Sequence, residues 1–201
     1  MAVVLCRGAG KRSFVFPGLK KSKRRTQAAG DPGTAISITC RELGSKDFVT
    51  ARDFSVIKYF AGIRANFAKI ACAAFLLELT ESTTAFAQRD DGVFELLAAA
   101  LATLENTEWV TGLAAFFAVH LIRLQGILSA PEEIYPENVS FILAAMQTKF
   151  VRLNPDDWNG EYVLALLDRL TSVVKQYFGS EVKSFDIFAA HCRKSTKQNN
   201  C

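Results

Sequence analysis

The chain has 201 residues, of which 50% are hydrophobic and 22% charged, with 5 Pro and 12 Gly. This composition excludes a disordered tail, a collagen-like repeat and a coiled-coil rod, and the length suffices for one domain or for a small domain attached to a larger one. The net charge of +4 is uneven, because residues 1–30 hold eight basic and no acidic side chains. The rest of the chain therefore carries a net charge of −4.

Residues 1–52 are predicted to form a small β module. Short apolar or alternating runs bounded by Gly, Pro and Asp are typical of strands. Such runs occur at 2–6, 13–16, 34–39 and 47–50. Residues 19–33, basic at first and then rich in Ala and Gly, are predicted to form a long exposed loop.

Residues 53–201 are predicted to form an all-α domain. Apolar residues at spacings of three and four form one stripe of a predicted helix, namely Phe54, Ile57, Phe60, Ile63, Phe67, Ile70, Ala74 and Leu77. Asp53 is a plausible N-cap of this helix, and a polar break follows at 80–87. Further helices are predicted at 91–104, 108–128, 138–148, 161–178 and 182–190, and Gly179 suits a helix C-cap. Residues 193–201 are polar and are expected to fray.

No catalytic constellation is recognisable, so we expect a protein that is not an enzyme. The run from Gly8 to Ser13 lacks the spacing of a phosphate-binding loop, and the carboxylate pairs at 132–133 and 156–157 are typical of solvated turns. His120 is expected to be a core histidine with a local hydrogen bond. Phe14 and Phe16 could stack on bases, although alternate strand positions favour the core.

The cysteines and the apolar runs give further expectations. Five cysteines at scattered positions, with only His120 and His191 as imidazoles, do not make a zinc site, so neither metal nor cofactor is expected. Free cysteines suit a reducing compartment. No run approaches the ~20 apolar residues of a membrane span. The apolar residues 2–5 precede the positive charges, unlike a secretory signal, and β-like segments argue against a transit peptide. We expect a cytoplasmic, nucleoid-associated protein.

A dense basic run is the main functional signal. Lys20, Lys21, Lys23, Arg24 and Arg25 place five cations in six residues, and Lys11 and Arg12 are expected to share one rim with them. Such a run repels itself unless a polyanion neutralises it, which favours nucleic acid bound without strong sequence preference. A solvated loop or a localisation signal is the alternative interpretation.

Several segments in order resemble the RecO family of bacterial recombination mediators. They are FPGLKKSKR at 16–24, GIRANFAK at 62–69, AAFLLEL at 73–79, FELL at 94–97, LQGILSAP at 124–131 and VKSFDIF at 182–188. The resemblance implies an N-terminal OB-fold, here short or incomplete, followed by a helical domain, and thus an α+β, mostly α protein. It also implies a non-enzymatic protein that binds single- and double-stranded DNA, anneals complementary strands and helps to load recombinase with single-strand-binding protein and RecR.

Two departures from the family pattern affect these expectations. Only residues 2–6 offer strand sequence before the basic loop, where the family usually has more. The four-cysteine zinc motif that many members carry after the proline matching Pro131 is also missing, because no cysteine follows until Cys192. A zinc site is therefore not carried over.

Arg123 is the candidate for contact with a protein partner. The family receives the acidic, aromatic tail of single-strand-binding protein in a groove of the helical domain, where Arg123 could supply the cation. It could equally be a surface arginine favoured by the dipole at a helix C-terminus. The alternative function is a helical protein-interaction module whose basic arm binds RNA or the ribosome.

Overall fold

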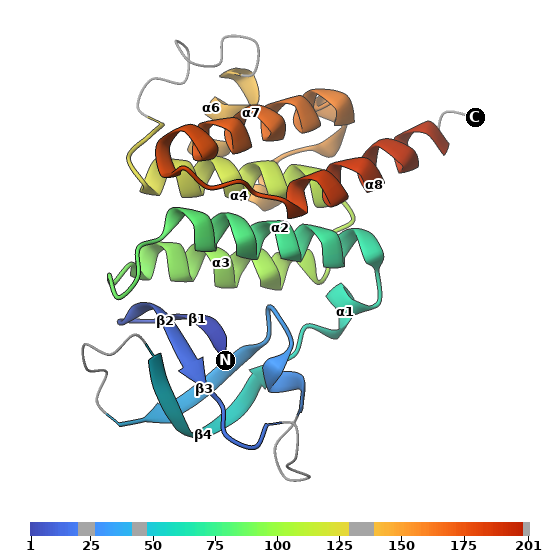
Figure 1. Cartoon of the computed structure of the whole chain (residues 1–201). Helices are drawn as coiled ribbons and strands as arrows, with labels where there is room; N and C mark the ends of the chain where they lie inside the picture. Colours follow the sequence, from blue (N-terminus) through green and yellow to red (C-terminus); the bar gives the residue numbers. More distant parts are fainter. Residues whose placement is uncertain (20–26, 42–47, 129–138, 199–201) are drawn as a thin grey trace.

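The computed structural model describes residues 1–19, 27–41, 48–128 and 139–198. A small β-sheet occupies one end of the molecule and a stack of helices the other, as Figure 1 shows. The fold is α+β and mostly α, with an open, OB-like β module followed by a helical domain, which confirms the predicted fold class.

Four strands form one sheet with the order β1-β2-β4-β3. β1 (Ala2–Cys6) and β2 (Gly10–Val15) form an antiparallel hairpin, and β3 (Ala35–Cys40) pairs antiparallel with β4 (Phe48–Lys58). The two hairpins join through parallel pairing of β2 with β4, where Phe14 lies opposite Val49. The four predicted strands are thus confirmed, although β2 begins three residues earlier and β4 is much longer than predicted.

A small apolar cluster packs against one face of the sheet. Its buried members are Phe14, Ala29, Val49, Ala51 and Phe54. Phe16 packs edge-to-face on Phe54, with 5.1 Å between ring centroids. Because both Phe14 and Phe16 belong to this packing, the core interpretation of these two aromatics is confirmed. Base stacking on them is not supported.

The connection from β2 to β3 is only partly an exposed loop. Leu19 packs against the sheet cluster, and the 3-10 helix η1 (Gln27–Gly30) buries Ala29 in it. Residues 20–26 lie outside the described residues.

The predicted helix beginning near Phe54 is wrong, because β4 continues to Lys58 and the predicted domain boundary at residue 52 falls within this strand. Asp53 is therefore a strand residue, paired with Thr39, and not an N-cap. A short helix, α1 (Ala61–Arg64), follows. The next helix, α2 (Phe67–Thr83), is capped by Asn66, whose side chain accepts a hydrogen bond from the Lys69 amide at 3.2 Å.

Five longer helices complete the described domain. They are α3 (Asp91–Leu104), α4 (Val110–Leu124), α6 (Val139–Gln147), α7 (Gly160–Phe178) and α8 (Ser184–Gln198), with short 3-10 turns η2 (Phe150–Arg152) and η3 (Pro155–Asp157) before α7. Gly179 ends α7 in the left-handed conformation with φ 68°, as predicted for a C-cap.

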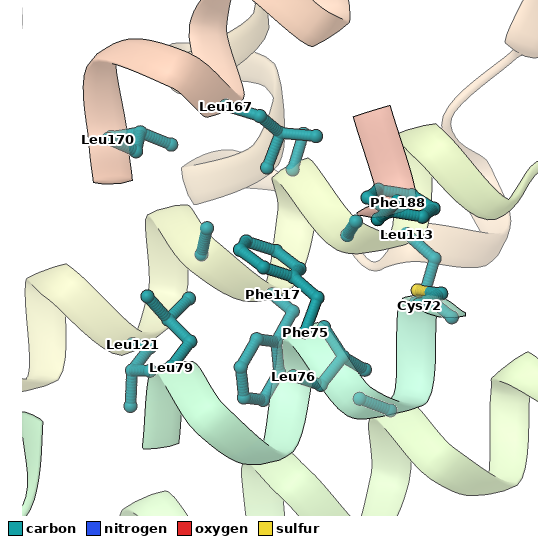
Figure 2. Close-up of a cluster of buried hydrophobic side chains, with 14 of the residues drawn as sticks. Cys72, Phe75, Leu76, Leu79, Leu113, Phe117, Leu121, Leu167, Leu170 and Phe188 are labelled. Atoms are coloured by element: carbon teal, nitrogen blue, oxygen red, sulfur yellow. The ribbon is translucent and has the colours of Figure 1, made fainter. Parts of the chain in front are cut away.

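α4 is the central helix and packs against α2, α3, α6 and α7. Its side chains Leu113, Phe117 and Leu121 interleave with Phe75 and Leu79 of α2, as Figure 2 shows. All five are at most 2% exposed. This core is far larger than the sheet cluster, so the helices supply most of the buried apolar surface in the described chain.

Three helices differ from their predicted bounds by more than one residue. α2 runs to Thr83, because Thr80 and Thr83 bury their hydroxyls by donating to carbonyls one turn back, Leu76 O at 2.8 Å and Leu79 O at 2.9 Å. α4 starts at Val110 and ends at Leu124. α8 runs to Gln198, so the expected fraying from residue 193 is wrong up to that point.

Candidate nucleic-acid interface

The cations among the first 30 residues that the structure describes do not share one exposed rim, because Lys11 is buried. Lys20, Lys21, Lys23, Arg24 and Arg25 lie outside the described residues. The three that are described, Arg7, Lys11 and Arg12, each make a contact within the chain.

Lys11 is buried against the helical domain, so its predicted place on the exposed rim is wrong. Its Nζ donates to the carbonyl oxygen of Glu81 at 2.5 Å and lies 4.9 Å from the centre of the Phe86 ring. Burial lowers the pKa of the ammonium, and the nearby Glu81 carboxylate opposes that shift. Successive side chains of a strand point to opposite faces, so Lys11 points towards α2 and Arg12 points to the other face of β2.

Arg7 and the β1–β2 turn are fastened to α3. Arg7 forms an ion pair with Glu95 at 2.6 Å and lies over the Phe94 ring, and the Gly8 amide donates to Oδ1 of Asp91 at 2.7 Å. Hydrogen bonds from Arg89 and then from Gly8 lower the pKa of Asp91. These contacts hold the β1–β2 hairpin against α3, and Arg7 is paired with Glu95.

Arg12 is the described cation of the predicted set that keeps partial access to solvent. Its Nε donates to the Ala9 carbonyl at 3.3 Å. This bond fixes the start of the side chain and leaves the two terminal amino groups of the guanidinium available for a phosphate.

Two exposed arginines on the sheet were missed by sequence reasoning. Arg41 follows β3 directly, and Arg52 lies in β4 one residue after Ala51, which pairs with Cys40. β2 leaves the sheet at Val15, opposite Thr50 of β4. The basic connection that follows β2 therefore starts at the same end of the sheet as Arg41 and Arg52. A charge count extended past residue 30 to the end of the predicted β module at residue 52 would have included both arginines.

Phe48 adds an exposed aromatic ring at this end of the sheet. It opens β4 opposite Ser13 of β2, two residues before the level at which β2 ends. Aromatic rings and cations together bind single strands through stacking and phosphate contacts. We define the cationic end of the sheet as Arg41, Phe48 and Arg52. The basic run at 20–25 follows β2 in the sequence and lies outside the described residues.

Arg123 is exposed in the last turn of α4. Burial lowers the pKa of nearby His120 most. A hydrogen bond to the Ala145 carbonyl opposes this shift, and the charge of Arg123 adds to it. His120 is half-buried, with Nε2 at 3.0 Å from that oxygen and its ring 4.4 Å from the centre of Phe116. The predicted hydrogen bond exists, but it reaches α6 and is not local.

Metal ligands and membrane spans were sought in the part of the chain that the structure describes. No group of three or more His, Cys, Asp or Glu residues there could hold a metal ion. Cys6, Cys40, Cys72 and Cys192 in this part form no disulfide, and burial raises the pKa of the Cys192 thiol to about 11. None of its helices is both long and apolar enough to cross a membrane.

A small open β-sheet beside a larger helical domain defines the chain as a two-part α+β protein. Residues 64–128, from the end of α1 to just beyond α4, match the family model for the Recombination protein O C terminal. Two similar proteins are named DNA repair protein RecO: one from Anaeromyxobacter dehalogenans strain 2CP-C, 29% identical over 119 residues, and one from Anaeromyxobacter sp. strain K, 32% identical over 119 residues. These matches confirm the resemblance to the RecO family.

Each of these alignments covers 59% of this chain and 47% of the relative. The chain thus spans about half the length of the curated relatives it matches. Their name attaches them to DNA repair, and the helical domain is the part of this chain that the family model matches.

Proposed function

We propose that this protein is a non-catalytic DNA-binding mediator of recombinational repair that anneals complementary strands. The observation that carries the proposal is the cationic end of the sheet on a chain whose helical domain matches the C-terminal domain of the RecO family. The names of the similar proteins support a role in DNA repair.

A cationic surface explains annealing in simple physical terms. Two strands repel each other through their phosphates, and a surface that neutralises several phosphates lowers that repulsion. Binding through counterion release is independent of sequence and weak at each contact, so the strands keep enough freedom to find their register.

The helical domain is proposed to hold the protein partners, namely single-strand-binding protein and RecR. Arg123 and the neighbouring exposed Leu124 at the end of α4 offer a cation beside an apolar side chain. An acidic peptide with an aromatic residue would match this chemistry. With its partners bound to the helices and DNA bound to the sheet, the protein would help to load the recombinase.

DNA binding is tested by titrating labelled single-stranded DNA at several salt concentrations. We expect the logarithm of the affinity to fall linearly with the logarithm of the salt concentration, by about 0.7 for each phosphate contacted. Replacing Lys20, Lys21, Lys23, Arg24 and Arg25 by Ala should weaken binding at least about tenfold and flatten this slope, since each lost contact removes released counterions.

A matched variant controls for net charge. It replaces five exposed cations of the helical domain by Ala, namely Lys149, Arg152, Lys183, Arg193 and Lys194. This variant should keep most of the affinity. Equal losses in the two variants, or annealing no faster than the spontaneous rate, would refute the proposal, and a clear preference for RNA would favour the RNA-binding alternative.

Arg123→Glu should reduce affinity for the tail peptide of single-strand-binding protein without changing DNA affinity.

A further inference from the structure

A groove separates the two outer strands of the sheet from the helices beneath them. Its volume is about 510 Å³. β1 contributes Ala2 to Leu5, the chain from Ala29 to Ile36 forms the opposite wall, and Leu77, Thr80, Phe94, Leu97, Ala98 and Leu101 of α2 and α3 form the floor. Figure 1 shows the sheet set against α3 on this side of the molecule.

Both strands that border the groove have an unpaired edge. Among the described strands, β1 pairs only with β2 and β3 only with β4. An edge strand presents a row of backbone N–H and C=O groups that can pair with one further strand. Here two such edges border the same groove.

The side chains of these edges are only half covered. Val4 and Cys6 of β1 and Ile36 and Ile38 of β3 pack on the sheet cluster and remain partly exposed. Covering such side chains is favourable, because each removes apolar surface from water. An additional strand with apolar residues at alternate positions would cover them.

Lys11 determines the charge that such a strand should carry. The residue is 8% exposed and lines the groove, and its ammonium has three hydrogens but donates one hydrogen bond in the described structure, to the Glu81 carbonyl. The carboxylates of Asp31 and Glu81 also border the groove, but both residues are exposed. A strand that sealed the groove would remove the remaining water from this ammonium, which is costly without an anionic acceptor.

We propose that the groove binds an extended peptide of a partner protein by strand addition. The peptide is five to six residues long, to match β1 and β3, with apolar side chains at alternate positions and one carboxylate that pairs with Lys11. Backbone pairing supplies the affinity, and the apolar and acidic positions supply the specificity.

Synthetic peptides test this proposal against the full chain. The probe is a fluorescein-labelled Ser-Val-Thr-Val-Glu-Val-Thr-Ser peptide with blocked ends, together with two versions in which Glu moves by two positions. Fluorescence anisotropy should show saturable binding for at least one register, and replacing its Glu by Gln should weaken binding about tenfold. Lys11→Met should remove the preference for Glu over Gln.

Two variants locate the binding site. Ala98→Trp on α3 should fill the groove and abolish binding, whereas Ala99→Trp on the exposed side of the same helix should leave it unchanged. Ile57→Glu, an exposed position at the groove mouth, should repel the acidic peptide and weaken binding without affecting folding. Bound peptide should also slow hydrogen exchange of β1 and β3 amides.

Three results would overturn the proposal. They are no saturable binding up to about 1 mM peptide, equal binding by the Ala98→Trp and Ala99→Trp variants when both are folded by circular dichroism, and a dimer in light scattering with the β1 and β3 amides already protected. The last result would assign the groove to a second copy of the chain.

Discussion

At the residue scale, single polar side chains join elements that are distant in the sequence. Glu78 on α2 accepts hydrogen bonds from the backbone amides of Lys183 at 3.2 Å and Ser184 at 2.7 Å, and also from the Ser184 hydroxyl. These amides belong to the start of α8, whose first-turn N–H groups have no partner within the helix. Glu78 therefore acts as a cap supplied by another helix.

Replacing Glu78 by Gln should lower the free energy of unfolding by about 1 kcal/mol, the usual value of a lost cap. Burial alone would raise the pKa of Glu78, but the hydrogen bonds from Ser184 and Lys183 outweigh it and leave the pKa below its ordinary value. The stabilisation is therefore complete above the unfolded pKa of about 4.3 and is lost as pH falls through the lower folded pKa.

Urea unfolding at several pH values measures this effect. The difference between the parent chain and the Glu78→Gln variant should be largest near pH 7 and shrink below about pH 4. Glu81→Gln, one turn further along α2, is the control, because its side chain receives no amide of α8 in the described structure. An equal loss in both variants would contradict the capping role.

At the element scale, Arg64 at the end of α1 fastens the sheet to the helices. Its guanidinium donates to the Tyr59 carbonyl at 2.8 Å, the Pro32 carbonyl at 3.1 Å and Oγ1 of Thr34 at 2.9 Å. It also lies 4.0 Å above the centre of the Tyr59 ring. One side chain thus joins the residue that follows β4, the segment before β3 and the first helix.

Arg64→Ala should loosen the β module more than the helical domain. Hydrogen exchange of β3 amides should accelerate by at least about tenfold, while exchange in α4 changes little, because the lost bonds anchor the segment that leads into β3. Arg64→Lys should accelerate exchange of the β3 amides nearly as much as Arg64→Ala, since an ammonium lacks the planar guanidinium that bridges several acceptors. Arg152→Ala, an exposed position beside α7, should change neither region, and uniform acceleration throughout the chain would count against the clamp.

The elements also show where the sequence pattern was sufficient. α3 was predicted to the residue, because its apolar positions Val93, Leu97 and Leu101 face one core and Asp90 caps it locally. The helix predicted from the apolar stripe between Phe54 and Ile63 is wrong. In this segment the end of a strand and a short helix follow one another, and their apolar residues have the spacing of a single helix. Ile57 in that stripe is 69% exposed. The segment is a strand because β4 pairs with β3, and this pairing is not visible in the local sequence pattern.

The candidate site could be predicted only in part for the same reason. A run of like charges is visible in the sequence, but the direction of each side chain depends on tertiary contacts. Lys11 looked like a member of the basic run, yet the contact with Glu81, 70 positions further on, buries it. Arg41 and Arg52 approach the exit of β2 only through strand pairing.

At the scale of the whole molecule, stability and charge are assigned to different ends. The helical core contains nearly all of the largest fully buried side chains, whereas the sheet cluster has five buried members. The cationic end of the sheet can carry charge at little cost to stability because the core lies elsewhere. The sheet in turn depends on the helices that it packs against.

Phe117→Ala at the centre of α4 should therefore destabilise the whole chain by about 3–5 kcal/mol. Phe117 is fully buried, and Figure 2 places it among the side chains of α2, α4 and α7. Urea unfolding followed by circular dichroism and by amide exchange in β2 should report one shared transition at lower urea. Leu124→Ala, an exposed position on the same helix, should have little effect. A β2 transition that stays at its original urea concentration would show that the sheet is independent.

The parallel pairing of β2 with β4 also constrains the order in which the chain folds. β2 ends at Val15 and its partner begins at Phe48, so the two meet only after the intervening chain has closed into a loop. Closing such a loop costs entropy before the contact repays it, and non-local pairing slows folding. Helices form from local contacts, so we expect the helical domain to form first and the sheet to pack against it afterwards. We therefore expect the pairing of β2 with β4, which brings Arg52 to the exit of β2, to form after the helices.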